Sequence, residues 1–210
     1  MQTVTSNQTA KKSVRKTGAN VRKMTMTAML SAVAFVLMFL DFSVPIMPSF
    51  IKMDLSELPA LIGAFAMGPL SGAAICLVKN LLHLFITTTG GVGELSNFLL
   101  GACFVIPAGL VYHKWKGKKA AVIGALLGAL LMGLVSIPSN YWIVYPFYYA
   151  IMPKETILAA YQAILPGVDN ILECMVVFNA PFTFVKGLLS VLITVLVYKH
   201  ISPIIKGAQE

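Results

Sequence analysis

Apolar runs long enough to cross a lipid bilayer follow one another along this 210-residue chain, and they limit what it can fold into. Hydrophobic residues make up 58% of the sequence and charged residues 11%. Soluble domains carry about 25% charged residues, so a bilayer is the natural solvent for this chain. A helix needs about 20 apolar residues to cross the hydrocarbon core, so six spans use roughly 120 residues. We therefore expect an all-α integral membrane protein with one compact helical domain.

Prolines, glycines and charged residues divide the apolar sequence into six expected spans, of which the second is short and contains Pro59. The spans are expected at 24–40, 55–67, 70–86, 94–112, 120–145 and 171–198. Residues 1–23 are polar and basic, which is typical of a tail without fixed structure. Residues 24–200 then form the membrane domain, and 201–210 form a second tail. The first apolar run continues past Ala32-Val33-Ala34, so we interpret it as a retained anchor rather than a cleaved signal peptide.

The positive charges lie mainly on one side of the expected membrane domain. Most lysines and arginines precede the first span, fill the loop at 112–119, or follow the last span. Because loops rich in lysine and arginine stay in the cytoplasm, both termini and this loop are expected there. Of the eight acidic residues only Glu210 then falls on the inner side. Orientation in a cell membrane explains the net charge of +8, so no nucleic-acid partner is expected.

The sixth span carries the sharpest group of polar residues. Asn179, Thr183 and Lys186 are four and three residues apart, so they share one helical face. A lysine inside a span costs about 2.5 to 3.5 kcal/mol on insertion scales, so Lys186 should face a cavity or a partner. It either donates to a ligand carbonyl or ring nitrogen, or is satisfied by a glutamate or helix carbonyls. Pro181 crowds the carbonyl of Val177, which predicts a kink that widens this side.

Other spans contribute polar residues whose role the sequence leaves open. Asn97 and Asn140 are expected at similar depth, where their amides either bind a heterocycle edge or join helices. Lys79 and His83 share a face of the third span. A structural role, in which the lysine bonds an outer acid such as Glu94 or helix carbonyls, is favoured over a direct ligand role.

Aromatic and small residues suggest surfaces rather than chemistry. The aromatic segment 141–149 fits an interfacial belt, with capping of a planar ligand as the alternative. Ala28 and Ala32, extended by Ser31, form a face of small residues that lets another helix approach closely. Gly124 and Gly128 make a similar face in the fifth span, where tight internal packing is expected.

Several functional classes lack their required motifs. The chain has no GxxxxGK[ST] segment, so it has no P-loop for ATP, and no HExxH segment for an intramembrane zinc protease. Its three cysteines show no paired spacing, so no metal site is expected. A membrane enzyme would need an acid beside Lys186, and we expect none at matching depth. A channel would need a continuous polar stripe, which no span shows.

Three segments resemble the riboflavin-specific substrate-binding subunits (S components) of energy-coupling-factor (ECF) transporters. They are KMDLSELPALIGAFAMGPLSGAA, KNLLHLFITTTGGVGELSNFLLG and NAPFTFVKG, within a resemblance over about 24–198. It implies a six-helix protein of the bacterial plasma membrane that captures riboflavin outside and delivers it for ATP-driven uptake. The implied partners are a transmembrane coupling subunit and two cytoplasmic ATPases. Riboflavin is the transported ligand, and no cofactor is implied. The alternatives are an S component for another vitamin, or an integral-membrane enzyme acting on a lipid-like substrate.

The resemblance also implies roles for particular residues. Ala28 and Ala32 match the family's docking motif, and Thr183 and Lys186 match its polar pocket positions. Members often have asparagine where this chain has Thr183. Riboflavin's pyrimidine-dione edge needs donors and its rings need apolar walls, so further contacts are expected. These are Asn97, Asn140, Asn179, Leu40, Ile51, Met53, Asp54 and Tyr145.

Overall fold

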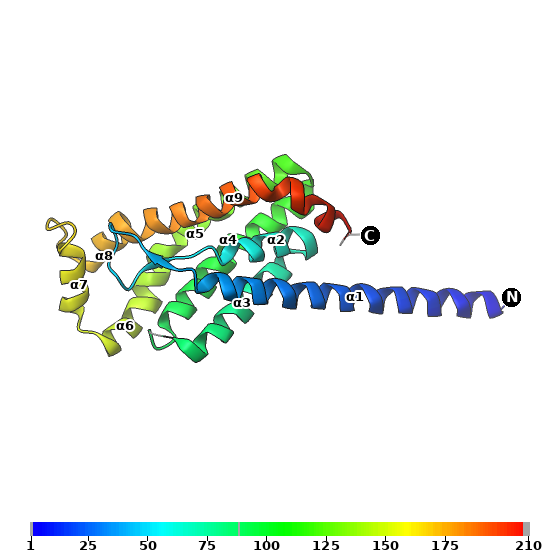
Figure 1. Ribbon diagram of the computed structural model, residues 1–210, viewed down its shortest axis with the longest axis horizontal. Helices are drawn as coiled ribbons and strands as arrows, with labels where there is room; N and C mark the ends of the chain where they lie inside the picture. Colours follow the sequence, from blue (N-terminus) through cyan, green and yellow to red (C-terminus); the bar gives the residue numbers. More distant parts are fainter. Residues whose placement is uncertain (1, 88, 208–210) are drawn as a thin grey trace.

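The structure, a computed structural model, describes the backbone of residues 2–87 and 89–207 and the side chains of residues 18, 20–87 and 89–197. Long helices run side by side through most of the molecule (Figure 1). In chain order the elements are α1 (Gln2–Met38), β1 (Phe42–Ser43), β2 (Lys52–Met53), α2 (Glu57–Met67), α3 (Pro69–His83), the 3-10 turn η1 (Leu84–Ile86), α4 (Val92–Trp115), α5 (Lys118–Ser139), the π-helical turn η2 (Asn140–Val144), α6 (Tyr145–Ile151), α7 (Lys154–Gln162), α8 (Ile171–Cys174), the π-helical turn η3 (Met175–Asn179) and α9 (Ala180–Gly207).

Five helical segments of the described chain are long and apolar enough to cross a membrane. They are Asn20–Met38, Pro69–Ile86, Val92–Trp115, Lys118–Ile151 and Ile171–Val197. The N-terminal end of α1 and the C-terminal part of α9 lie at the same end of the molecule, and α6, α7 and α8 lie at the other (Figure 1). The fold is therefore an α-helical membrane bundle, with the antiparallel pair β1–β2 as a small addition outside the helices.

The expected second span differs from the prediction. Helix α2 has 11 residues, about 16 Å at 1.5 Å per residue, and so falls short of a hydrocarbon core of about 30 Å. The chain ends α2 at Gly68, whose φ of 106° suits a residue without a side chain, and Pro69 starts α3 at once. Nine of the 11 residues of α2 are buried, so this short helix is part of the bundle core.

Glycines let α5 pack directly on α4. A side-chain carbon at Gly124 would lie 2.8 Å from the carbonyl oxygen of Ala108, and one at Gly128 would overlap the carbonyl oxygen of Phe104. The expected internal packing role of these two glycines is therefore confirmed.

Helix α1 has an inward and an outward face. Ala28 and Ala32 are both exposed, so they lie on the outward face. Ser31 is only 1% exposed and donates to the carbonyl of Thr27 at 2.8 Å, so it lies on the inward face. The prediction that Ser31 extends the alanine face was wrong, because one helical residue turns the side chain by about 100°.

Two π-helical turns interrupt the long helices, each ending two residues before a proline. The turn η2 precedes Pro146, and η3 precedes Pro181. Proline lacks the N–H that an α-helix needs and crowds a carbonyl of the preceding turn, which a wider π turn accommodates. The expected disturbance near Val177 thus takes the form of a π turn.

The segments expected outside the membrane domain contain more helix than predicted. Helix α1 begins at Gln2, where a tail without fixed structure was expected; no proline precedes Pro45, so nothing in this stretch breaks a helix. The expected loop at 146–170 contains α6 and α7. Helix α9 continues through 201–207 of the expected second tail, whose last three positions, 208–210, lie outside the described residues. Thr88 of the outer turn also lies outside them.

Candidate functional site

A cavity of about 320 Å³ opens among the β1–β2 segment, the turn between α3 and α4, the η2 turn and the start of α9. Eight of the ten expected ligand residues line it, although they are spread over more than half of the chain. They are Ile51, Asp54, Asn97, Asn140, Tyr145, Asn179, Thr183 and Lys186. Apolar side chains, among them Met38, Phe50, Leu100, Met132 and Phe182, form part of the remaining wall, and further polar side chains form the rest.

Two expected wall residues do not line the cavity in the described part of the chain. Leu40 follows the end of α1 and is 64% exposed. Met53 is buried beside Met47 and Phe182. Successive side chains of a strand point to opposite faces. Met53 therefore points away from the cavity, because its neighbour Lys52 lines the cavity.

Lys186 is held at the cavity by three oxygen-bearing side chains. Its Nζ donates to Asp54 Oδ2 at 2.9 Å and to Asn97 Oδ1 at 3.3 Å, and it lies 3.2 Å from Glu57 Oε2. The expectation that no acid lies at the depth of Lys186 was wrong. The segment before α2 and the first residue of that helix enter the bundle and carry Asp54 and Glu57 inward, to 7% and 1% exposure. The structural reading of Lys186 is confirmed, because it is paired with acids. It also lines the cavity, so donation to a ligand stays a prediction.

A second lysine completes this charged cluster from outside the cavity. Lys79 is fully buried and donates to Glu57 Oε1 at 3.0 Å and to the hydroxyl of Ser56. Glu57 therefore bridges Lys79 and Lys186, and Asp54 supplies the second negative charge. The structural reading of Lys79 is confirmed, with Glu57 rather than Glu94 as the partner.

The charge of Asp54 is stabilised by its surroundings. Its Oδ1 accepts from the backbone N–H of Ser56 at 2.8 Å. Burial by itself would raise the pKa of the Asp54 carboxyl, but the ammonium groups of Lys186 and Lys79 outweigh burial and hold this pKa well below its ordinary value. Two carboxylates and two ammonium groups thus form a compact neutral cluster beneath the cavity.

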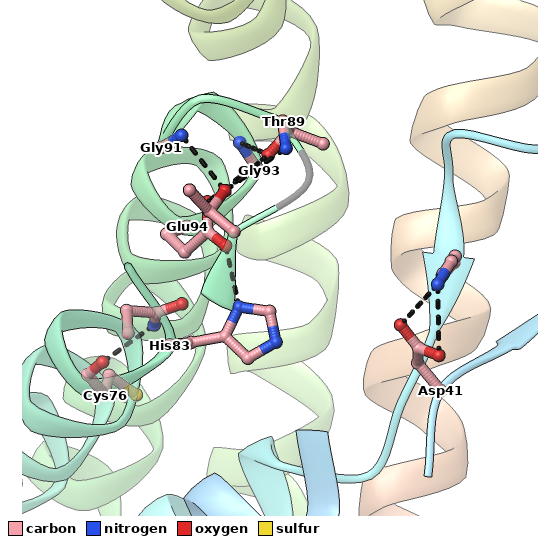
Figure 2. Close-up of polar contacts among 10 residues, drawn as sticks. Asp41, Cys76, His83, Thr89, Gly91, Gly93 and Glu94 are labelled. Atoms are coloured by element: carbon pink, nitrogen blue, oxygen red, sulfur yellow. Dashed lines mark hydrogen bonds and ion pairs between the residues drawn. The ribbon is translucent and has the colours of Figure 1, made fainter. Parts of the chain in front are cut away.

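Glu94 organises the outer turn at the rim of the cavity. Its Oε1 lies 2.7 Å from His83 Nδ1, and its Oε2 accepts from Thr87 at 2.9 Å and Thr89 at 3.3 Å. Figure 2 shows these groups gathered around the Glu94 carboxylate, with the His83 ring reaching up from α3. A carboxylate in the first turn of α4 is also favoured by the helix dipole. The Glu94 carboxylate therefore links the outer turn at the rim to both α3 and α4.

A separate ion pair lies on the other side of the same rim. Lys52 Nζ is 3.0 Å from Asp41 Oδ2. Both residues line the cavity with His83 and Glu94. Figure 2 shows Asp41 across from His83 and Glu94. The two side chains are 45% and 32% exposed, so this pair is weaker than the buried cluster.

The aromatic segment 141–149 serves two surfaces. Trp142 is 73% exposed and Phe147 54%, as an interfacial belt requires. Tyr145 and Tyr148 line the cavity, as the alternative reading requires. Asn140 accepts from Ser96 at 3.4 Å beside them.

One residue behind the cavity was missed by the sequence analysis. Tyr161 of α7 is fully buried and donates to Asn179 Oδ1 at 2.7 Å. It lies within the segment expected to be a loop. The signal was the pair Ile157 and Tyr161, four residues apart, both of which are buried on one face of α7.

These features can hold a small solute, because the cavity wall offers hydrogen-bond donors and acceptors together with apolar side chains. Among the described residues, no group of three or more His, Cys, Asp or Glu side chains is placed to hold a metal ion. Membrane-length helices around such a cavity define an integral membrane protein with a cavity of small-solute size. The chain belongs to the substrate-specific components of ECF transporters, a family that it matches over residues 22–198.

Individual relatives agree with this assignment. The chain is 31% identical over 180 residues to the riboflavin transporter RibU of Staphylococcus aureus (strain TCH60), covering 85% of this chain and 89% of that protein. It is 30% identical over 188 residues to the riboflavin transporter FmnP of Bacillus subtilis (strain 168), covering 87% and 93%. A solved structure described as the S component of a bacterial ECF transporter superposes with a TM-score of 0.70 at 28% identity, covering 89% of this chain and 99% of that one.

Proposed function

We propose that this protein is a riboflavin-binding S component, which captures the vitamin outside the cell and delivers it for ATP-driven uptake. The observation that carries the proposal is the meeting of Lys186, Asn97 and Asn140 at one largely apolar cavity. The relatives from Staphylococcus aureus and Bacillus subtilis are both riboflavin transporters, and the similarity to each extends over most of the chain.

The cavity suits the chemistry of riboflavin. The pyrimidine-dione edge presents carbonyls and a ring N–H, which amides and an ammonium can complement. Met132, Leu100 and Phe182 offer apolar contact for the ring system. Tyr145 and Tyr148, at the η2–α6 junction, are placed to cover a planar ligand by offset stacking.

The proposed orientation puts both termini and the α4–α5 turn in the cytoplasm. In support, the N-terminal end of α1 and the C-terminal part of α9 point toward the end of the molecule opposite α6–α8 (Figure 1). The α4–α5 turn also carries lysines, as cytoplasmic loops do. In this orientation the chain crosses the membrane in six segments, with α2 as an incomplete one packed inside the bundle. The setting is the bacterial plasma membrane.

The proposed partners are a transmembrane coupling subunit and two cytoplasmic ATPases, because the chain contains no P-loop of its own. The protein is then a transport subunit rather than an enzyme. The exposed Ala28 and Ala32 allow close approach of another helix, which makes the outward face of α1 the proposed docking surface.

A direct test is flavin titration of the purified protein. Flavin-free protein is prepared by purification from riboflavin-starved cells, and quenching of riboflavin fluorescence is followed during titration. We expect saturable quenching with one site per chain and yellow protein when cells are grown with riboflavin. Absence of quenching, together with binding of a different vitamin, would refute the proposed ligand.

A further inference from the structure

Three side chains form a closed hydrogen-bonded ring behind the cavity. Tyr161 donates to Asn179 Oδ1 at 2.7 Å, Asn179 Nδ2 donates to the Tyr145 hydroxyl at 3.2 Å, and the hydroxyls of Tyr145 and Tyr161 are in contact. Tyr145 and Asn179 line the cavity, whereas Tyr161 is fully buried and is not among the lining residues. The ring therefore links a residue of α7 to two residues at the proposed ligand site.

Counting protons fixes the direction of each bond. A tyrosine hydroxyl has one proton. Tyr161 uses its hydroxyl proton in the hydrogen bond to Asn179, so the hydrogen bond between the two hydroxyls must run from Tyr145 to Tyr161. Tyr145 then has no proton left for a ligand. Asn179 has used one of its two N–H groups and keeps the other.

The surroundings of Tyr161 hold it in this role. It packs edge-on against Phe50, with ring centres 6.2 Å apart, and beside Phe178 at 5.2 Å. Ile157, one turn earlier on α7, is buried in the same apolar cluster. Burial raises the pKa of the Tyr161 hydroxyl far above its ordinary value, so the hydroxyl keeps its proton at any pH at which the protein works.

We infer that Tyr161 is a positioning residue for ligand binding. It fixes the Asn179 amide so that an N–H faces the cavity, and it accepts the hydrogen bond that the Tyr145 hydroxyl would otherwise donate to the ligand. The free N–H of Asn179 then donates to an acceptor on the ligand, such as a carbonyl or hydroxyl oxygen, and Tyr145 contacts the ligand with its ring face. Helix α7 acts on binding through this ring without touching the ligand. The inference rests on the proposed function, because it concerns the same cavity.

A double-mutant cycle on riboflavin binding separates this role from general support of the fold. Tyr161→Phe should weaken riboflavin binding about tenfold, because Asn179 loses the partner that orients its amide. In an Asn179→Ala background the same Tyr161→Phe change should alter affinity by less than about twofold, because the orienting bond has no target. Tyr141→Phe, at an exposed position of the same aromatic segment, is the matched control and should leave affinity unchanged.

Replacing Tyr161 by 4-aminophenylalanine retains an N–H donor at the ring position and should recover most of the affinity. If Tyr161→Phe yields no folded protein, Tyr161→Met carries the same cycle with a more adaptable side chain. Equal losses from Tyr161→Phe in both backgrounds, or none in either, would overturn the inference while wild-type binding stands. Failure of the wild-type protein to bind riboflavin would instead remove the proposed function itself.

Discussion

The ammonium of Lys186 lies 2.9 Å from a carboxylate oxygen of Asp54, a residue 132 positions earlier in the chain. This contact joins the last helix to the segment that follows β2, and Glu57 and Asn97 complete the set around the same ammonium. An ammonium has three N–H groups, of which two are matched by hydrogen bonds to Asp54 and Asn97, while Glu57 is an ion-pair contact at 3.2 Å. The bond to Asn97, at 3.3 Å, is the longest, and an arriving ligand carbonyl should replace that one first.

The Asp54 carboxylate should stabilise the protein in a pH-dependent way. Its pKa is lowered below the ordinary 3.8, so its stabilising effect is complete above that value and is lost as pH falls toward the lower folded pKa. Wild type should therefore be more stable than Asp54→Asn by a constant margin between pH 5 and 8. That margin should shrink below about pH 4. Melting temperatures of both proteins in detergent across this range test it; a margin that changes between pH 6 and 8 would contradict the assignment.

Lys79 should matter for stability far more than Lys52. Lys79→Met leaves Glu57 buried with one partner fewer, which typically costs about 3–5 kcal/mol. Lys52→Met removes a half-exposed pair and should cost at most about 1 kcal/mol. Thermal unfolding of the two variants gives the comparison. Similar losses would mean that the buried cluster is not a structural unit.

Much of the fold follows from patterns that the sequence displays openly. Apolar runs locate the membrane-length segments to within a few residues at most of their ends, and Lys186 inside the last span marks the cavity face of α9. Pro181 indicates a disturbance in the right place, but sequence alone does not distinguish a kink from the π turn η3. The sequence predicts a span at the short, mostly buried helix α2, because its composition is that of a span and only its length differs.

The charged cluster could not be predicted, because it depends on tertiary path rather than local pattern. Asp54 precedes α2 and Glu57 is its first residue, and both fit the outer end of a span equally well; only the entry of this segment into the bundle brings them to Lys186. Tyr161 was missed for a similar reason. Its segment contains Pro153 and Gly167 at either side, which suggests a loop, and its partner Asn179 is 18 positions away.

Close packing of α5 on α4 predicts a strong effect of a small substitution. Gly128→Ala places a methyl group onto the carbonyl oxygen of Phe104, so it should destabilise by about 1–3 kcal/mol despite the better helix propensity of alanine. Gly167→Ala is the control, since nothing lies within 4 Å of the added carbon. Melting temperatures in detergent provide the measurement, and a Gly128→Ala protein as stable as the control would show that the two helices separate easily.

The proposed docking face can be separated from ligand binding. Changing Ala28 and Ala32 together to tryptophan should leave riboflavin affinity within about twofold, because both side chains point away from the bundle. Uptake in cells that contain the ECF module should fall severely, because two indole rings prevent a partner helix from approaching. Ile123→Trp, on an exposed part of α5, is the control for added bulk. Undiminished uptake by the double variant would move the docking surface elsewhere.

Riboflavin titration of Lys186→Ala tests the central claim most directly. Removing the ammonium takes away a donor at the ligand site and leaves Asp54 and Glu57 with one cation fewer between them, so affinity should fall at least 100-fold, about 2.7 kcal/mol. Lys154→Ala makes the same chemical change on the exposed surface of α7 and should bind like wild type. Circular dichroism of both variants establishes that they are folded. A folded Lys186→Ala protein that quenches riboflavin fluorescence with wild-type affinity would contradict the site.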